Sequence, residues 1–98
     1  MKVVYNACYG GFGLNDAAIV RYWEIKGMPK PDDWWERSID RDDPTLIQVV
    51  EELGQAAGDK YSDLKIKDVP SGTRWRIDEY DGYEQVMTVD DYDWKTAT

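Results

Sequence analysis

A glycine-rich junction between an apolar run and an amphipathic run is the feature that most limits how this chain folds. Three glycines occupy four positions in Gly10-Gly11-Phe12-Gly13, shortly after the apolar residues 3–5. Glycine permits positive φ angles and close approach to the backbone, so the junction predicts a sharp turn from a strand into a helix. The N-terminus of that helix offers unpaired N–H groups and a partial positive charge, which also suits an anion. From the residues alone, a structural turn and a ligand-binding loop both stay open.

Two helices are predicted, one directly after the glycine junction and one in the middle of the chain. Asn15 is a favourable N-cap for the first helix, which should span residues 16–26 and end at Gly27. The second helix should begin at Pro44, with Asp43 as its N-cap, and should be terminated by Gly58. Its apolar residues recur at the spacing of one helix face: Leu46, Val49, Val50, Leu53 and Ala57.

The strands are predicted from alternating apolar residues and from one strong turn signal. Residues 2–8 and 64–69 alternate as strands. Asp81-Gly82 favours a two-residue type I′ turn, which joins residues 73–80 and 83–89 in a hairpin. We therefore expect a single domain over residues 1–98, of class α+β, with two helices packed on one mostly antiparallel sheet in the order β-α-α-β-β-β.

Composition and charge narrow the functions open to the chain. The net charge of −8 argues against direct binding to nucleic acid or to anionic membrane, and it favours a basic partner. The absence of histidine removes Ser-His-Asp and Cys-His catalysis and the commonest zinc ligand. Because no acidic cluster fits a calcium-binding loop either, we predict no catalytic residues, no metal, no cofactor and no enzyme. No apolar run approaches the roughly 20 residues that span a bilayer, and no signal peptide is expected.

An anionic, nucleotide-type ligand is the first candidate for binding. The glycine junction matches neither formal phosphate motif, but it supplies a strand, a flexible backbone and a helix N-terminus in the right order. Phe12 is expected at the exposed tip of the loop, and two arginines from the hairpin would supply positive charge, unless they pair with carboxylates such as Asp78. The predicted ligand-binding residues are Tyr9, Gly10, Gly11, Phe12, Gly13, Asn15, Arg74 and Arg76.

Aromatic residues outside the predicted core are the second candidate for binding. The chain has five tryptophans and seven tyrosines, and such rings are enriched at interfaces, although small domains also use them to fill their cores. Trp34 and Trp35 are adjacent and cannot both face the same core, so one should anchor the loop and the other should be exposed. The predicted partner-binding residues are Trp34, Trp35, Tyr80, Tyr83, Tyr92 and Trp94.

A resemblance to a known family covers most of the chain in order. It is carried by Tyr5-Asn6-Ala7-Cys8-Tyr9-Gly10-Gly11-Phe12-Gly13-Leu14, Arg41-Asp42-Asp43-Pro44, Val49-Val50-Glu51-Glu52-Leu53-Gly54, Leu64-Lys65-Ile66 and Ile77-Asp78-Glu79-Tyr80-Asp81-Gly82. These segments resemble a family of small proteins from tailed bacteriophages and prophages that carry a CYGGFGL motif. The resemblance implies a phage origin and synthesis in the cytoplasm of a bacterial host, and it carries no settled activity. The acidic Asp90-Asp91-Tyr92-Asp93 stretch departs from the family pattern.

Small phage proteins of this size commonly bind host machinery, and many counter host defence. By this analogy the leading hypothesis is a non-enzymatic phage protein that counters host defence by sequestering an anionic, nucleotide-type signal. A homo-oligomer would help one small chain to bury such a ligand. The rival hypothesis is an acidic protein–protein inhibitor, or a DNA mimic, that occludes a host defence protein.

Overall fold

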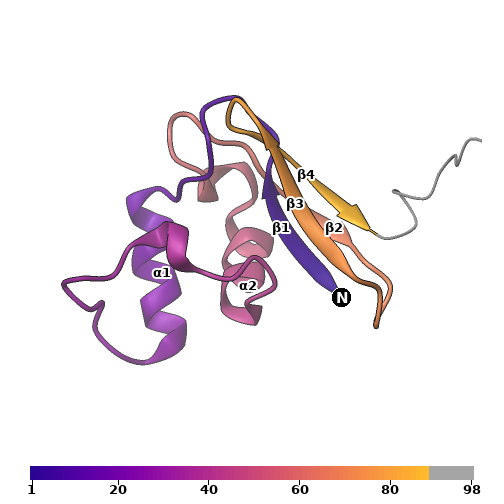
Figure 1. The fold of residues 1–98 in the computed structure, drawn as a ribbon. Helices are drawn as coiled ribbons and strands as arrows, with labels where there is room; N and C mark the ends of the chain where they lie inside the picture. The colour runs from indigo at the N-terminus through magenta and orange to yellow at the C-terminus, as the bar shows by residue number, and fades with distance from the viewer. Residues whose placement is uncertain (89–98) are drawn as a thin grey trace, which may run out of the picture.

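The chain forms two helices and two two-stranded antiparallel sheets, in the order β-α-α-β-β-β (Figure 1). The computed structural model describes residues 1–88. The predicted α+β class and element order are confirmed. The elements are β1 (Lys2–Asn6), α1 (Asp16–Lys26), α2 (Pro44–Leu53), β2 (Leu64–Asp68), β3 (Trp75–Tyr80) and β4 (Tyr83–Thr88), with short 3₁₀ turns at Glu36–Ser38 and Gly54–Ala57.

The strands divide between two sheets, where we expected one. β1 pairs with β2, and β3 pairs with β4. Side chains occupy the place where a backbone ladder would join the two sheets. The backbone N–H of Asn6 donates to the carboxylate of Glu84 (2.9 Å), and the ammonium of Lys67 donates to the carbonyl of Val86 (3.2 Å). Because these groups are already satisfied by side chains, a continuous four-stranded ladder does not form.

The two faces of β1 belong to two different apolar clusters. Val4 is fully buried among residues of α1 and α2, while Val3 is fully buried against Val69 and Val86. β1 therefore lies between the helices and the β3–β4 hairpin, as Figure 1 shows. This follows from the alternation of side chains along a strand, which sends neighbours to opposite faces.

The helix starts are as predicted, but the end of α2 is not. The side chain of Asn15 accepts a hydrogen bond from the N–H of Ala18 (2.8 Å), and that of Asp43 accepts one from Thr45 (2.7 Å). The α-helical hydrogen bonding of α2 stops at Leu53, because Gly54 has a φ of 58°. A 3₁₀ turn then carries the chain to Ala57, which still reaches the core.

The predicted two-residue turn at Asp81-Gly82 fixes the register of the hairpin, and this register is observed over the whole described length. Asp81 (φ 53°) and Gly82 (φ 89°) form the two-residue turn, with both φ angles positive as type I′ requires. Tyr80 therefore pairs with Tyr83, and Glu79 pairs with Glu84. This register sends Ile77, Glu79 and Glu84 to one face and Tyr80 and Tyr83 to the other, which decides what the hairpin offers to solvent.

Candidate functional site

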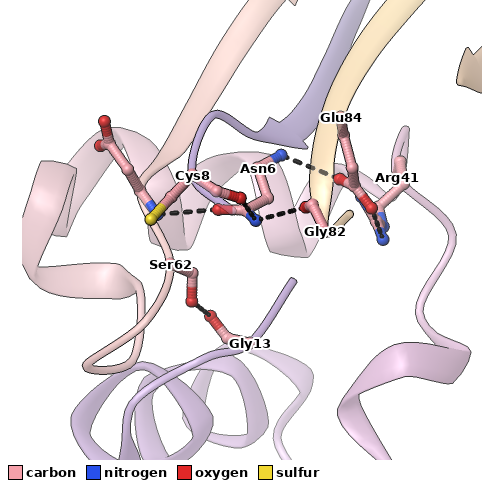
Figure 2. A network of polar contacts seen from close by, with 8 residues as sticks. Asn6, Cys8, Gly13, Arg41, Ser62, Gly82 and Glu84 are labelled. Carbon is pink, nitrogen blue, oxygen red and sulfur yellow. Dashed lines mark hydrogen bonds and ion pairs between the residues drawn. The ribbon is translucent and has the colours of Figure 1, made fainter. Parts of the chain in front are cut away.

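The glycine junction is filled by the protein's own chain. The carbonyl of Gly13 accepts hydrogen bonds from the N–H of Asp59 (3.2 Å) and from the hydroxyl of Ser62 (2.9 Å; Figure 2). The next two N–H groups are also bound: that of Leu14 donates to the carboxylate of Glu36 (2.9 Å), and that of Asn15 donates to the carbonyl of Ala57 (3.0 Å). Three backbone donors around the start of α1, those of Leu14, Asn15 and Ala18, are therefore used within the fold.

Two of the glycines are required by close packing. A Cβ atom on Gly10 would collide with the backbone of Tyr61, and a Cβ atom on Gly13 would collide with the carboxylate of Asp59. Both contacts come from the segment that follows α2 and leads into β2. Of the two open interpretations of the glycine run, the geometry therefore supports a structural turn packed on a distant loop.

Phe12 is buried, which corrects the expectation that it stands at an exposed tip. Only 4% of Phe12 is accessible, and the guanidinium of Arg41 lies 3.8 Å from its ring centroid. The ring belongs to the same apolar cluster as the helices. Burial of a large ring, together with a cation over its face, stabilises this inward position.

The arginines of the hairpin were expected to converge on the glycine junction, and they do not. The turn next to Tyr80 is the part of the hairpin that contacts residues 8–11. Arg76 lies four residues earlier on β3, which at strand rise is about 13 Å away, and Arg74 is further still. Arg76 is 63% exposed and pairs with Asp78 on its own strand (3.0 Å). The structure therefore supports the alternative, pairing with a carboxylate, for this arginine.

A buried asparagine at the end of β1 holds three loops together, and the sequence did not single it out. Asn6 is fully buried (Figure 2). Its side-chain N–H groups donate to the carbonyls of Cys8 (2.7 Å) and Gly82 (2.9 Å), and its side-chain oxygen accepts from the N–H of Asp63 (2.8 Å). One amide thus joins the glycine junction, the hairpin turn and the loop before β2.

A buried ion pair completes this arrangement. The guanidinium of Arg41 donates to both carboxylate oxygens of Glu84, and the distance from Nη2 to Oε2 is 2.9 Å. The side chain of Glu84 is only 6% exposed. The same carboxylate accepts the backbone N–H of Asn6. We call Asn6, Arg41 and Glu84 the Asn6 clamp. The side-chain polar atoms of Asn6 and Glu84 all bind Arg41 or backbone groups of β1 and the loops, so the role of the clamp is to position the loops.

The clamp brings together three tyrosines on the outside of these loops. Tyr9 is 64% exposed and Tyr80 is 78% exposed. The rings of Tyr9 and Tyr83 are in contact, with centroids 5.2 Å apart and planes tilted by 52°. These three residues, the tyrosine surface, line an open groove of about 450 Å³ with Asp78, Glu79 and Gln85. We had assigned Tyr9 to a ligand and Tyr80 and Tyr83 to a partner, and the structure places all three in one groove.

A further exposed tyrosine lies on the neighbouring loop. Tyr61 is 61% exposed, and its backbone packs directly on Gly10, next to Tyr9 in the chain. Sequence reasoning missed Tyr61, because nothing local shows that the loop before β2 meets the glycine junction. Its position in a polar segment between a helix and a strand was the only available signal.

The two adjacent tryptophans take different positions, as predicted. Trp34 packs against Tyr22 (centroids 5.8 Å apart) and Trp23 (5.4 Å), so it anchors the long loop and is partly buried. Trp35 is 61% exposed.

Burial raises the pKa of Tyr22, and so does its hydrogen bond to Asp43 (2.7 Å). Tyr92 and Trp94, the remaining predicted partner residues, lie outside the described residues.

Residues 1–88 contain no group of three or more acidic or cysteine side chains placed to hold a metal ion. In the same part of the chain, no helix has the length and apolar character needed to cross a membrane. No protein-family model, no curated protein and no solved structure matches the chain. The geometry of the tyrosine surface and the clamp beneath it is therefore the basis for a functional proposal.

Proposed function

We propose that this chain is a non-enzymatic binding protein that uses the tyrosine surface to occlude another protein. The observation that carries the proposal is the convergence of Tyr9, Tyr80 and Tyr83 around one groove, with Tyr9 and Tyr80 largely exposed. Tyrosine is among the residues that dominate binding energy at protein interfaces. It offers a large amphipathic contact area and loses little conformational entropy on binding.

The charge of the chain supports a basic protein as the partner. The net charge is −8, and none of the residues that line the groove is basic. Opposite charge on a partner would speed its association and would make that association slow down as ionic strength rises. Together with the resemblance to phage proteins, this favours an inhibitor that acts on a host defence protein in the bacterial cytoplasm.

Sequestration of a nucleotide has weaker support. Its expected site used the glycine junction and two arginines, yet the junction is packed by the chain itself and Arg76 pairs with Asp78. Calorimetry with cyclic and ADP-ribose-type nucleotides tests that hypothesis directly. Binding at micromolar concentration would restore it and would require a site other than the start of α1.

The protein-binding proposal is tested by affinity capture from bacterial lysate, quantified by mass spectrometry. The wild type is compared with a Tyr9→Ser/Tyr80→Ser variant and with Val20→Ser as a control. Val20 is 59% exposed on α1 and does not line the groove. We expect a protein that the wild type and the control both retain and that the tyrosine variant loses. Equal recovery by all three would contradict the proposal.

A further inference from the structure

The outer edge of β3 has no hydrogen-bonded strand beside it within residues 1–88, because β3 pairs with β4 only. The corresponding edges of β1 and β4 are contacted from within the fold. The N–H of Val4 donates to the carbonyl of Arg41 (2.8 Å), and the ammonium of Lys67 donates to the carbonyl of Val86. β2 carries two lysines in its five residues, and lysine on an edge strand opposes pairing with another chain. Since β3 has neither lysine nor proline, it is the edge strand with the least protection against such pairing.

The register of the hairpin decides which backbone groups of β3 point to this open edge. In a two-residue hairpin the residues that flank the turn form a hydrogen-bonded pair, and such pairs recur at every second residue. Tyr80 and Tyr83 flank the turn, so the residues of β3 whose N–H and C=O groups point away from β4 are Trp75, Ile77 and Glu79. The carbonyl of Val86, opposite Ile77, accepts from Lys67 outside the hairpin, in agreement with this alternation.

The charges of β3 select one way for this edge to pair with its own copy. When Ile77 faces Ile77 of a second, antiparallel copy, Arg76 of each chain faces Asp78 of the other. A shift of one strand by two residues keeps the outward backbone groups facing each other, but it places either Arg76 opposite Arg76 or Asp78 opposite Asp78. Directly opposite charges of unlike sign stabilise an antiparallel pair, and like charges destabilise it. The edge is therefore complementary to itself in the register centred on Ile77.

We propose that the chain forms a two-fold symmetric dimer in which β3 pairs with β3 of a second copy, centred on Ile77. Three facing residue pairs would exchange about six backbone hydrogen bonds and join the two hairpins into one four-stranded sheet. Arg76 lies 3.0 Å from Asp78 of its own strand, so the four side chains at the axis would alternate in charge. Ile77 is only partly buried beside the cluster of Val3 and Val86, and its equivalent in the second copy would cover it. This inference goes beyond the proposed function and does not depend on it.

Sedimentation velocity over a range of protein concentrations tests the dimer. The mass of one chain is 11.4 kDa, and we expect the wild type to form a species of twice this mass as its concentration rises. Arg76→Glu places like charges opposite each other at two positions and should weaken dimerisation about a hundredfold. Lys65→Glu, the control, reverses an exposed charge on β2 and should leave dimerisation unchanged. A wild type that stays monomeric up to about 1 mM would overturn the inference and leave this edge to a strand of a different protein.

A mixture of two single variants tests the register of the pairing. Asp78→Arg, like Arg76→Glu, places like charges across the axis, so neither variant should dimerise well alone. In the mixture each introduced charge faces an opposite charge on the other chain, so a heterodimer should form about as tightly as the wild-type dimer. A wild type that dimerises while the mixture does not, or an Arg76 variant that dimerises like the wild type, would contradict the pairing.

Hydrogen exchange of the wild type gives a readout that needs no substitution. The backbone N–H of Ile77 points outward in the monomer and would be bonded in the dimer. Its exchange, followed by NMR, should therefore slow as the protein concentration rises. The N–H of Asp78 bonds within the hairpin in both states, so its exchange should change far less. Exchange at Ile77 that is independent of concentration, in a protein shown to dimerise, would place the interface elsewhere and overturn the inference.

Discussion

The Asn6 clamp and the tyrosine surface lie next to each other and have opposite properties. In the clamp, Asn6 and Glu84 are buried and every polar atom of their side chains has a partner. In the tyrosine surface, Tyr9 and Tyr80 expose most of their area, although each is only a few residues from the clamp. A folded chain gains stability from the first arrangement and almost none from the second. The clamp therefore serves folding, and the tyrosine surface is the region for which we propose a binding role.

The largest effect is expected from removing the side chain at the centre of the clamp. Asn6→Ala takes away three hydrogen bonds and leaves two carbonyls and one N–H buried without partners. Each such group costs about 1–3 kcal/mol, so we expect a loss of about 4 kcal/mol in the free energy of unfolding. A urea titration followed by circular dichroism measures it. A loss below about 1 kcal/mol would show that the clamp does not hold the loops.

A somewhat smaller loss is expected from breaking the ion pair of the clamp. Glu84→Gln keeps the shape of the side chain but leaves Arg41 buried without an opposite charge, and we expect a loss of about 3 kcal/mol in stability. In a double-mutant cycle with Arg41→Gln, the double variant should lose clearly less than the sum of the two single losses. Strict additivity of the two substitutions would contradict their direct coupling.

The packing of the glycine junction gives a third test. Gly13→Ala places a methyl group against the carboxylate of Asp59, which is held by the N–H of Tyr61 (2.8 Å) and the hydroxyl of Ser62 (2.6 Å). Moving this carboxylate should cost about 2 kcal/mol of stability. Gly27→Ala is not a matched control, because the φ of Gly27 is 73°. Ala56→Gly, on the neighbouring 3₁₀ turn, is a suitable comparison and should cost about 1 kcal/mol or less.

A buried tyrosine provides a contrast with the exposed ones and has the smallest effect. Because the pKa of Tyr22 is raised in the folded state above its ordinary value of 10.0, its contribution to stability is complete below pH 10. It is lost as the pH rises above 10, since the unfolded chain then ionises more readily. The free energy of unfolding of the wild type should therefore fall between about pH 9.5 and 11. In Tyr22→Phe this fall should be weaker, at a cost of about 1 kcal/mol at neutral pH for the lost hydrogen bond to Asp43.

The local signals of the sequence were enough for most of the fold. Asn15 and Asp43 cap their helices through contacts two or three residues away, and Asp81-Gly82 sets the hairpin register through its own φ angles. Gly54 was overlooked as the end of α2, because the apolar pattern continues to Ala57 in spite of the break. The division of the strands into two sheets depends on the side chains of Glu84 and Lys67. The alternation of apolar residues along the sequence does not indicate which groups these side chains bind.

The candidate site was less predictable, because its contacts join distant parts of the chain. Gly13 and Ser62 are 49 residues apart, and Arg41 and Glu84 are 43 apart. From the sequence, Phe12 and Tyr9 were equivalent aromatic residues on one loop. The structure distinguishes them. Arg41 lies over the ring of Phe12, which belongs to the core, while the hairpin turn packs beside Tyr9, whose side chain is on the surface. The sequence therefore drew attention to the aromatic residues of this region but did not show how the fold groups them.

The central claim is that the tyrosine surface is the part of the molecule that touches a partner. Site-specific photocrosslinking in bacterial cells tests it most directly, with a photoreactive phenylalanine analogue placed at position 80, 9 or, as a control, 20. We predict that positions 80 and 9 crosslink to the same protein and that position 20 on α1 does not. Crosslinks to one protein from position 20, with none from positions 80 and 9, would contradict the account.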